Sequence, residues 1–452
     1  MASFSINVSL EDMQTILVAG AGKSSVYLIQ YLLSQASRKK WKLIVADGDA
    51  KTISDKIKGS PFAEKAVIDI TNTKEREALV KRADIVVSLM PAHLHIHLAQ
   101  DCLKHKKNLI TSSYISPEMK AMDAEVKKAG LMFMCEMGLD PGIDHMTASH
   151  IIHGIQRVAG IITSFKSYCG GLVAPESDDN PWHYKFSWNP KNIITAGYDG
   201  AKYLSQGKEV DVPYEKMFED NKKIKNEVLG LLAYYPNRDS LRYLGLYDVP
   251  EAKTFMRATL RYPGFCKGWD ALIKLGLTDD KDTVNTKGLT YASWLKNKTG
   301  HKSGTLISHI AKKLDISETD KSISMLKWLG LFDEKPVTEG KSSADILLQV
   351  LLDKWQMKPE DKDIVVLQHE VEYFHKDRKT KLTSSMTLTG ENSEYSAMAK
   401  TVGLPIGILT KLVLDKRINP PTGVLIPNMA TVYRPVLTEL KHHGISFKDE
   451  IE

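Results

Sequence analysis

Short apolar runs alternate with amphipathic segments along the first 140 residues, and this alternation constrains the fold more than any other feature of the chain. The runs of strand length are Thr15–Ala19, Leu43–Ala46, Ala66–Ile70, Asp84–Leu89, Asn108–Ser112 and Leu131–Glu136. The segments with helical spacing are Val26–Leu33, Lys74–Arg82, His95–His105 and Pro117–Ala129. Strands separated by helices of about a dozen residues predict a doubly wound parallel sheet with helices on both faces.

A glycine-containing turn joins the first predicted strand to the first predicted helix. Glycine permits a tight turn and a close backbone approach, and the helix N-terminus offers unpaired N–H groups to a pyrophosphate. Serine stands at the third glycine position of the usual fingerprint and is small enough for helix–strand packing. The turn therefore predicts a Rossmann-type dinucleotide domain, with a plain strand-to-helix turn as the alternative for the motif alone. The predicted phosphate contacts are Gly20, Gly22, Lys23, Ser24 and Ser25.

The same turn also contains the letters Gly-Lys-Ser, which end the phosphate-binding loop of nucleoside triphosphatases. That loop needs a glycine five residues before Gly22, and Leu17 stands there inside the strand. The triphosphatase interpretation is therefore excluded.

Acidic residues follow the second and third predicted strands. Asp47 ends the second strand, where a carboxylate binds both ribose hydroxyls and favours NAD over NADP. Asp49 is a rival for this role, and Lys51 leaves NADP open. Asp69 and Ile70 are predicted beside the adenine, although Asp69 could equally be a turn-forming residue. Leu89, Pro91 and Ser112 lie at later strand carboxyl ends, the edge at which such sheets bind ligands.

An HxHxH pattern, formed by His93, His95 and His97, resembles a metal site. On a helix these side chains would not share one face, and no carboxylate or cysteine accompanies them. No metal site is expected.

The second part of the chain has a different pattern of predicted strands, loops and helices. We expect a strand over Ile161–Tyr168, a long loop over Gly170–Pro181 and a helix-rich segment over Gly264–Glu339. Strand-like alternation returns in two runs that could form a hairpin, and an apolar segment at helical spacing follows them: Asp363–Tyr373, Leu382–Leu388 and Ser396–Leu414. A second α/β domain with a helical insertion is therefore predicted.

Composition excludes several classes of protein. The net charge of +6 is modest and spread along the chain, so nucleic acid is not an expected partner. No apolar run of 18 residues predicts a membrane span, and residues 1–14 show no targeting signal. The cysteines are widely spaced, which favours reduced thiols and a cytoplasmic location: Cys102, Cys135, Cys169 and Cys266.

Six sequence blocks carry a resemblance to a known family. They are TSSYISP (Thr111–Pro117), EMGLDPGIDHM (Glu136–Met146), SYCGGLVAPESDDNPWHYKFSW (Ser167–Trp188), YPNRDS (Tyr235–Ser240), RATLRYPGF (Arg257–Phe265) and SAMAKTVGLP (Ser396–Pro405). In this order they closely resemble the glutamate-forming saccharopine dehydrogenases, also called saccharopine reductases, whose domain also occurs in aminoadipic semialdehyde synthases.

The resemblance implies NAD(P)-dependent oxidation of saccharopine at a C–N bond, followed by hydrolysis to glutamate and 2-aminoadipate 6-semialdehyde. It also implies a homodimer and three parts of the chain. These are a dinucleotide domain over 1–140 completed by about 391–452, a substrate and dimerisation domain over 141–263 and 340–390, and a helical insertion over 264–339.

Site residues are carried over by motif. The resemblance places Ser113, Tyr114, Asp140, Cys169 and Gly170 at the substrate, and Leu139, Asp140 and Pro141 at the cofactor. It places Arg238, Thr259, Leu260 and Arg261 at the substrate carboxylates, with Arg257 as a third candidate arginine.

The chemistry favours particular roles within this set. Arginine pairs with a carboxylate through two charge-assisted bonds. Tyr114 and Asp140 are candidates for the proton transfers of imine hydrolysis, the alternatives being a packed aromatic and a helix-capping Asp. Cys169 is expected beside the reacting atoms without forming a covalent intermediate. Asp144 and His145 could contribute, although Asp144 equally resembles a helix N-cap.

Two other functions remain open at this stage. A related dehydrogenase of another carboxylated imine, such as carboxynorspermidine, would share the glycine turn. A cofactor-binding scaffold without turnover would share the fold.

Overall fold

The computed structural model describes residues 13–219 and 222–452, and contacts divide the chain into two compact units. Unit 1 comprises Met1–Val158 and Glu394–Phe447, and unit 2 comprises Ala159–Ser393 and Lys448–Glu452. Unit 1 extends past the predicted limit at residue 140, because α7 (Ile143–Arg157) packs against α16 (Ala430–His442). Its C-terminal part ends before the predicted limit at residue 452, because β16 (Lys448–Ile451) pairs with β14 (Arg378–Thr389) in unit 2. The predicted lack of a targeting signal concerns residues 1–14, of which 1–12 lie outside the described ranges.

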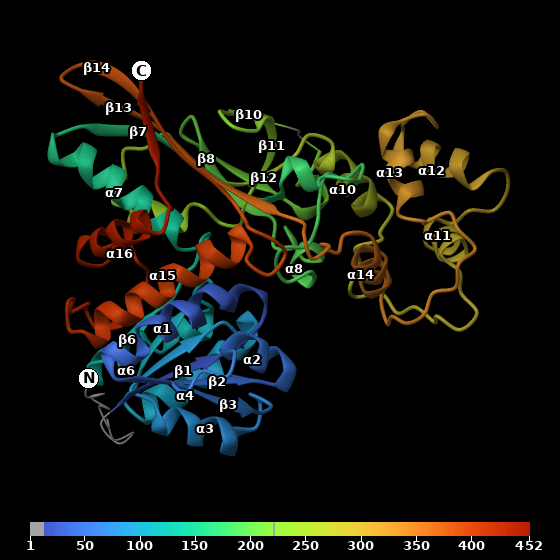
Figure 1. Ribbon diagram of the computed structural model, residues 1–452. Helices are drawn as coiled ribbons and strands as arrows, with labels where there is room; N and C mark the ends of the chain where they lie inside the picture. The colour runs from blue at the N-terminus through green and yellow to red at the C-terminus, as the bar shows by residue number, and fades with distance from the viewer. Residues whose placement is uncertain (1–12, 220–221) are drawn as a thin grey trace. The chain divides into compact units, whose positions relative to one another are not determined.

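Unit 1 is built on a seven-stranded sheet in which every described pair is parallel, as predicted (Figure 1). In spatial order the strands are β15 (Gly423–Leu425), β6 (Met132–Met134), β5 (Asn108–Thr111), β4 (Ile85–Ser88), β1 (Gln14–Ala19), β2 (Trp41–Asp47) and β3 (Ala63–Val67). The strand order reverses between β1 and β4. At such a switch point the carboxyl ends of the strands leave a crevice for a ligand.

Helices cover the sheet of unit 1. They are α1 (Val26–Lys39), α2 (Ala50–Ile57), α3 (Thr73–Arg82), α4 (His95–Lys104), α5 (Pro117–Ala121), α6 (Asp123–Lys128), α7, α15 (Ala397–Leu414) and α16. The four predicted segments are helical, with Pro117–Ala129 divided into two helices, and α2 was not predicted. One sheet face packs against α3, α4 and α6 in a common hydrophobic core. The late apolar helix α15 was predicted and lies along α1 (Figure 1).

Helix α15 corrects the expectation about apolar runs. Its 18 residues are long and apolar enough to cross a membrane by length and composition, but 78% of the segment is buried inside the protein. Gly403 and Gly407 explain its close contact with α1, because a Cβ at these positions would lie 2.9 Å from Leu28 N and 2.8 Å from Tyr31 Cδ1. The hydropathy of α15 therefore reflects its place in the core.

Strand β3 ends earlier than predicted, at Val67. Asp69 and Ile70 consequently lie in the loop that follows it. The strand lies three residues earlier than the predicted run 66–70. Residues 63–67 pair with β2 and are partly or fully exposed, whereas Ile70 is buried in the core after the strand has ended.

Unit 2 contains a mixed nine-stranded sheet. Its main path is β10 (Lys222–Asn226), β11 (Gly230–Pro236), β12 (Thr254–Arg261), β7 (Ile161–Val173), β13 (Asp363–His375), β14 and β16, with β8 (Ala201–Ser205) and β9 (Lys208–Val212) at the side of β12. The predicted hairpin is confirmed, because β13 and β14 pair throughout their length around Lys376 and Asp377. Both turn residues have positive φ angles, as in a type I′ turn.

The loop predicted to begin at Gly170 is wrong at its start, since β7 continues to Val173. A Cβ on Gly170 would lie 2.7 Å from Leu260 Cβ and 2.7 Å from Leu260 O. Glycine here permits close strand packing and does not end the strand.

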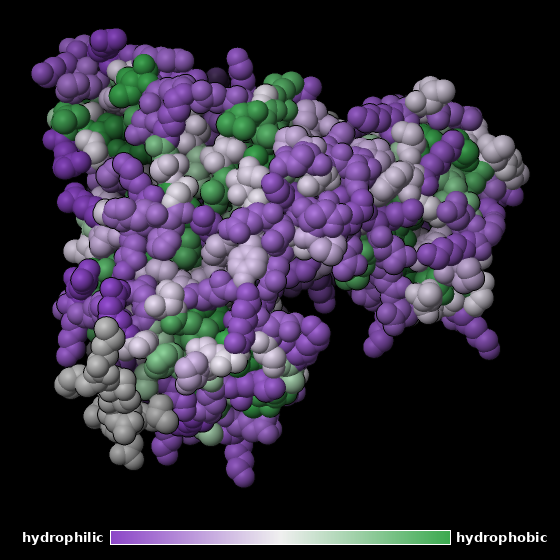
Figure 2. All heavy atoms as spheres, in the orientation of Figure 1, coloured by the Kyte–Doolittle hydropathy of each residue, from purple (hydrophilic) through white to green (hydrophobic). Residues whose placement is uncertain are grey.

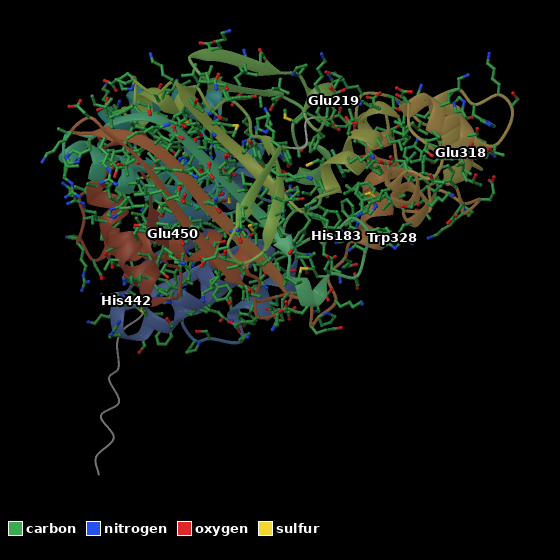
Figure 3. All side chains as sticks on the ribbon, turned by 90° about the horizontal axis from the view of Figure 1, so that it is seen from above. His183, Glu219, Glu318, Trp328, His442 and Glu450 are labelled. Carbon is green, nitrogen blue, oxygen red and sulfur yellow. The ribbon has the colours of Figure 1, made fainter. Side chains whose placement is uncertain are left out.

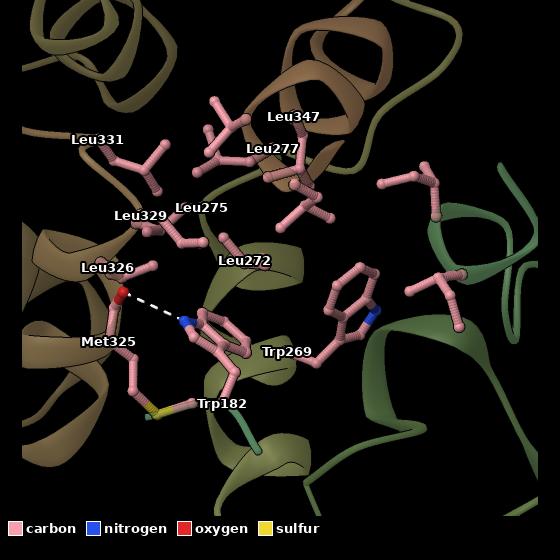
Figure 4. Close-up of a cluster of buried hydrophobic side chains, with 14 of the residues drawn as sticks. Trp182, Trp269, Leu272, Leu275, Leu277, Met325, Leu326, Leu329, Leu331 and Leu347 are labelled. Carbon is pink, nitrogen blue, oxygen red and sulfur yellow. Dashed lines mark hydrogen bonds between the residues drawn. The ribbon is translucent and has the colours of Figure 1, made fainter. Parts of the chain in front are cut away.

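The helices of unit 2, apart from α9, gather around one aromatic core. They are α8 (Lys191–Ile194), α9 (Arg242–Leu246), α10 (Phe265–Lys274), α11 (Tyr291–Thr299), α12 (Leu306–Leu314), α13 (Lys321–Trp328) and α14 (Ser343–Lys354), so helical structure extends beyond the predicted limit at residue 339. Figure 4 shows Trp182 and Trp269 among leucines from several helices, and Trp182 Nε1 donates to Met325 O at 3.2 Å. Trp328, labelled in Figure 3, faces the Lys354 ammonium at 5.3 Å and links α13 to α14.

Hydrophilic residues cover most of the face drawn in Figure 2, with smaller hydrophobic areas between them. The large apolar side chains named above are instead buried in the two units.

Candidate active site

The glycine turn of unit 1 has the geometry of an anion site. Gly20 has a φ of 100°, and a Cβ there would lie 2.9 Å from Leu89 C, so both its conformation and its packing require glycine. Gly22 has no such internal reason, because a Cβ there would meet nothing within 4 Å. The open space over Gly22 fits a phosphate brought close to the backbone. Lys23 and Ser24 follow in a short 3-10 turn, and buried Ser25 closes the turn by donating to Gly22 O at 2.8 Å.

Asp47 and Asp49 make different hydrogen bonds at the end of β2. Asp47 Oδ2 accepts from Ala21 N at 2.8 Å, which ties the strand end to the glycine turn. Asp49 caps α2 by accepting from Lys51 N at 2.9 Å and Thr52 Oγ1 at 2.6 Å, and these bonds hold the pKa of its carboxyl below the usual value. The rival candidate is therefore a helix cap.

A cavity of about 420 Å³ opens at this edge of the sheet. Its lining contains Asp47, Asp69 and Glu75 but no lysine or arginine: Ala46, Asp47, Gly48, Val67, Ile68, Asp69, Ile70, Glu75, Met90 and Leu94. The structure thus brings Asp47, Asp69 and Ile70 to one cavity, as their predicted cofactor role requires.

Asp69 forms a turn and also lines the cavity, so both predicted roles are compatible with its position. Its Oδ1 accepts from Thr71 N at 2.8 Å and from Thr71 Oγ1 at 2.7 Å, which makes it a turn-forming residue. The bond from Thr71 N holds the pKa of the Asp69 carboxyl below its usual value, so the side chain stays charged where it lines the cavity.

The remaining predicted cofactor residues of unit 1 differ in exposure. Pro91 is exposed, and Leu89 and Ser112 are partly buried. Leu139 and Pro141 are buried, so their contribution is limited to backbone atoms and to shaping the turn that carries Asp140.

Tyr114 and Asp140, the predicted proton-transfer residues of unit 1, lie together. Tyr114 Oη donates to Asp140 Oδ1 at 2.8 Å, and both residues are partly exposed. The helix-capping alternative for Asp140 is wrong, because α7 begins after Gly142, whose N–H donates to Asp144 Oδ1 at 2.6 Å. A phenol bonded to a carboxylate at a solvent-accessible edge can pass a proton to or from a substrate.

A buried pair lies behind these two residues, and sequence reasoning named its member His145 but missed its partner Glu136. Glu136 and His145 are fully buried, and Glu136 Oε2 lies 2.8 Å from His145 Nε2. Glu136 Oε1 accepts from Ile115 N at 3.0 Å, and Glu136 N donates to Ser113 O at 3.0 Å. Glu136 therefore fixes the backbone on both sides of Tyr114. Its position at the head of the EMGLDPGIDHM block was the available signal.

The three histidines of the HxHxH pattern do not belong to any group of potential metal ligands among the described residues. His95 is buried, whereas His93 is exposed and His97 half-buried. His95 Nδ1 lies 2.8 Å from Ser88 Oγ, and His95 Nε2 lies 2.8 Å from Ser113 Oγ. Burial lowers the pKa of His95 to about 4, so the ring is neutral at physiological pH.

In unit 2 the predicted substrate residues gather on two neighbouring strands. Cys169 of β7 pairs with Thr259 of β12, and Gly170 packs against Leu260. Side chains alternate along a strand, so Thr259 and Arg261 share one face and Leu260 lies on the other. Leu260 is fully buried in a separate core and can contact a ligand only through its backbone.

Arg261 ends β12 and is only 4% exposed. Its Nη1 donates to Leu260 O at 2.8 Å and its Nη2 to Tyr235 Oη at 3.1 Å. Its guanidinium lies over the rings of Tyr184, Tyr235 and Phe265 at 5.3 to 5.6 Å. Among the described residues no carboxylate pairs with Arg261, and its Nε has no hydrogen-bond partner. A buried cation in this state requires an anion.

The other two candidate arginines differ from each other in burial. Arg257 is 1% exposed and stacks over Tyr243 at 4.6 Å. Arg238 has a φ of 52°, and its side chain is 56% exposed and lies 3.4 Å from Asp199. Arg238 is thus a surface side chain of unit 2, whereas its backbone O accepts from Lys202 N at 2.9 Å.

Sequence profiles of two domains match the chain. The saccharopine dehydrogenase NADP binding domain matches residues 16–134, and the saccharopine dehydrogenase C-terminal domain matches residues 138–445.

Individual proteins agree with the profiles. The chain is 37% identical over 401 residues to saccharopine dehydrogenase [NADP(+), L-glutamate-forming] of Saccharomyces cerevisiae, covering 86% of this chain and 90% of the relative. It is 34% identical to mitochondrial alpha-aminoadipic semialdehyde synthase of Bos taurus, covering 98% of this chain and 48% of that protein. The solved structure of apo histidine-tagged saccharopine dehydrogenase (L-Glu forming) from Saccharomyces cerevisiae superposes with a TM-score of 0.86 at 33% identity, over 97% of this chain and 100% of that chain.

Proposed function

The chain belongs to the saccharopine dehydrogenase family, and from this membership we propose that it interconverts saccharopine with glutamate and 2-aminoadipate 6-semialdehyde, using a nicotinamide dinucleotide. Unit 1 supplies the dinucleotide site, and unit 2 supplies the cationic groups for the substrate carboxylates. A bound nicotinamide ring would supply the acceptor for the hydride that leaves the lysine-derived terminal carbon of saccharopine, at its bond to the glutamate nitrogen. Water then adds to the resulting imine, and the C–N bond breaks to release glutamate.

The environment of Arg261 is the observation that supports this proposal most strongly. Saccharopine has three carboxylates, and Arg261 is a buried cation with aromatic walls and no carboxylate partner in the described chain. Its unpaired Nε leaves a donor for a substrate carboxylate, and such charge-assisted bonds are the strong ones. Cys169 and Thr259 lie on the adjoining strand positions and form part of the same wall.

Tyr114 and Asp140 handle protons in this scheme. Their hydrogen bond at 2.8 Å allows one proton to move between the phenol and the carboxylate. We assign to this pair the removal of a proton from the amine of saccharopine and the activation of water at the imine.

The test of the proposal is turnover of saccharopine by the purified chain, followed as NADH or NADPH absorbance with glutamate and semialdehyde identified as products. Steady turnover supports it and dismisses a non-catalytic scaffold. Turnover of carboxynorspermidine without turnover of saccharopine would replace it with the related imine dehydrogenase.

For the cofactor we propose NAD in preference to NADP. The similar proteins favour NADP instead, because the domain that matches residues 16–134 is an NADP binding domain and the fungal relatives are NADP(+) enzymes by name. The cavity of this chain presents Asp47, Asp69 and Glu75 and no described lysine or arginine, and its carboxylates would repel a 2′-phosphate. Lys51, the cation that the sequence offered after β2, pairs with Asp55 at 2.6 Å.

Replacing Asp47 by Ser tests this preference. We expect the NAD/NADP ratio of kcat/KM to fall roughly tenfold or more, as loss of one charge-assisted bond to a ribose hydroxyl implies. Asp49→Ser is the matched control, because serine can still cap α2 and the variant should leave the ratio unchanged. An unchanged ratio in Asp47→Ser would refute the role of Asp47.

We also propose a cytoplasmic homodimer. The four cysteines are buried free thiols, which suits a reducing compartment. Cell fractionation and light scattering of the purified protein test location and oligomeric state.

A further inference from the structure

A buried hydrogen-bonded chain of three side chains runs behind Ser113 in unit 1. Ser88 ends β4 at the switch point of the sheet, between Ala19 of β1 and Thr111 of β5. His95 is the first residue of α4, and its two ring nitrogens lie 2.8 Å from Ser88 Oγ and 2.8 Å from Ser113 Oγ. Ser113 sits on the loop after β5, next to Tyr114, and is partly exposed.

The hydroxyl of Ser88 determines which ring nitrogen carries the proton. Ser88 is 0% exposed, and His95 Nδ1 is the hydrogen-bond partner that its hydroxyl has among the described residues. A buried hydroxyl proton must be donated, so Ser88 donates to Nδ1, and Nδ1 is bare. The neutral ring then carries its proton on Nε2 and donates it to Ser113 Oγ.

Burial and the helix N-terminus both favour the neutral ring. His95 is 4% exposed at the first position of α4, where the positive end of the helix dipole disfavours a positive charge on the ring. Burial is the main cause that lowers the pKa of His95, and the neighbouring His93 lowers it further.

We propose that His95 is a positioning residue that turns the Ser113 hydroxyl outward as a hydrogen-bond donor to an acceptor atom of the substrate, such as a carboxylate oxygen. Ser113 Oγ accepts from His95 Nε2, so its own proton points away from His95 toward the exposed side of the loop. This inference rests on the proposed function for the identity of the acceptor. The direction of the hydrogen bonds rests on the protein alone.

The tautomer is tested without substrate. Histidine labelled with ¹⁵N gives distinct signals for protonated and bare ring nitrogens, and the His95 signals are identified by their loss in His95→Gln. A bare Nδ1 and a protonated Nε2 at neutral pH are expected. The opposite tautomer, or a doubly protonated ring, overturns the proposal even if saccharopine is turned over.

The effect of His95 on substrate binding is tested by two variants whose side chains differ in length. In His95→Asn the side chain can accept from Ser88 but is too short to reach Ser113, whereas in His95→Gln the amide reaches the position of Nε2 and can donate to Ser113. We expect the KM for saccharopine to rise about tenfold in His95→Asn with little change in kcat, and by less than about threefold in His95→Gln.

Combination with Ser113→Ala separates positioning from general damage to the fold. If His95 acts through Ser113, adding His95→Asn to Ser113→Ala leaves KM unchanged within about twofold. A further tenfold rise in this background would overturn the proposal. His97→Asn, on the same helix and half-buried, is the control and should match the wild type. If His95→Asn does not fold, the wild-type tautomer still decides, and absence of turnover in the wild type would instead reject the proposed function.

Discussion

Arg261 shows at the scale of one residue how a site can be recognised from incomplete pairing. Its guanidinium is buried among Tyr184, Tyr235 and Phe265, with hydroxyl and carbonyl partners but no carboxylate in the described chain. A buried charge without a counter-ion costs stability, and it is retained where a ligand supplies the anion.

Replacing Arg261 by Met should therefore weaken substrate binding without unfolding the protein. We expect the KM for saccharopine to rise on the order of 100-fold, as loss of about 3 kcal/mol from a charge-assisted pair implies. The melting temperature should be unchanged or higher, because an uncompensated buried charge is removed. Arg378→Met, an exposed arginine of β14 in the same unit, is the kinetic control. A normal KM in Arg261→Met would contradict the assignment.

His95 predicts how stability depends on pH. Its pKa is about 4 in the folded chain, against about 6.5 in an unfolded one, so the unfolded state takes up the proton first. The contribution of His95 to stability is present above pH 6.5 and is lost as the pH falls toward 4, by about 3 kcal/mol over that window. Urea unfolding at pH 7, 6 and 5 measures it, with His95→Gln as the control. Equal pH slopes in the two proteins would show that His95 is not responsible.

At the scale of elements, glycines decide how closely helices and strands approach. The sequence predicted α15 from its apolar spacing, but not its partner. Gly403 and Gly407 explain the choice, because they let α15 lie directly on α1. The same physics corrected the prediction at Gly170, where a glycine taken for the start of a loop allows β7 and β12 to pack closely.

Substituting Gly403 by Ala should destabilise unit 1 by roughly 1–3 kcal/mol, since the added Cβ would lie 2.9 Å from the backbone nitrogen of Leu28. Chemical denaturation measures the change. Gly154→Ala in α7 is the matched control, because its Cβ would have only an ordinary contact at 4.0 Å from Arg157. That control should be neutral or up to about 1 kcal/mol more stable, as expected for alanine in a helix.

At the scale of the whole molecule, each unit is completed by a distant part of the chain. Unit 1 takes β15, α15 and α16 from the C-terminal region, and β15 pairs with β6 through Gly423, Val424 and Leu425. Unit 2 takes β16, whose residues are all exposed. The two C-terminal contributions therefore differ in how much core they bury.

Truncation distinguishes the two contributions. A chain ending at Ser393 should lose both the cooperative unfolding of unit 1 and dinucleotide binding, because removal of α15 exposes the hydrophobic core that this helix covers. A chain ending at Phe447 loses only β16 and should keep dinucleotide binding with a small fall in melting temperature. Circular dichroism and cofactor titration measure both. Dinucleotide binding by the shorter chain would show that the N-terminal segment folds without its C-terminal part.

The sequence by itself determined the elements whose signals are local. Hydrophobic period, the glycine turn and Asp47 at the end of β2 predicted the parallel sheet and its ligand edge, since these depend on neighbours within a few residues. The hairpin of β13 and β14 was predicted from the same local signals, but its two-residue turn at Lys376 and Asp377 was not.

Tertiary structure alone decided which polar groups meet and which are buried. It paired Tyr114 with Asp140, placed His95 between two serines, and buried Arg261 while leaving Arg238 at the surface. None of this could be read from the chain, because burial and hydrogen-bond partners depend on residues far apart in sequence. Once the backbone is placed, the need to satisfy each buried donor and charge assigns these side chains their roles.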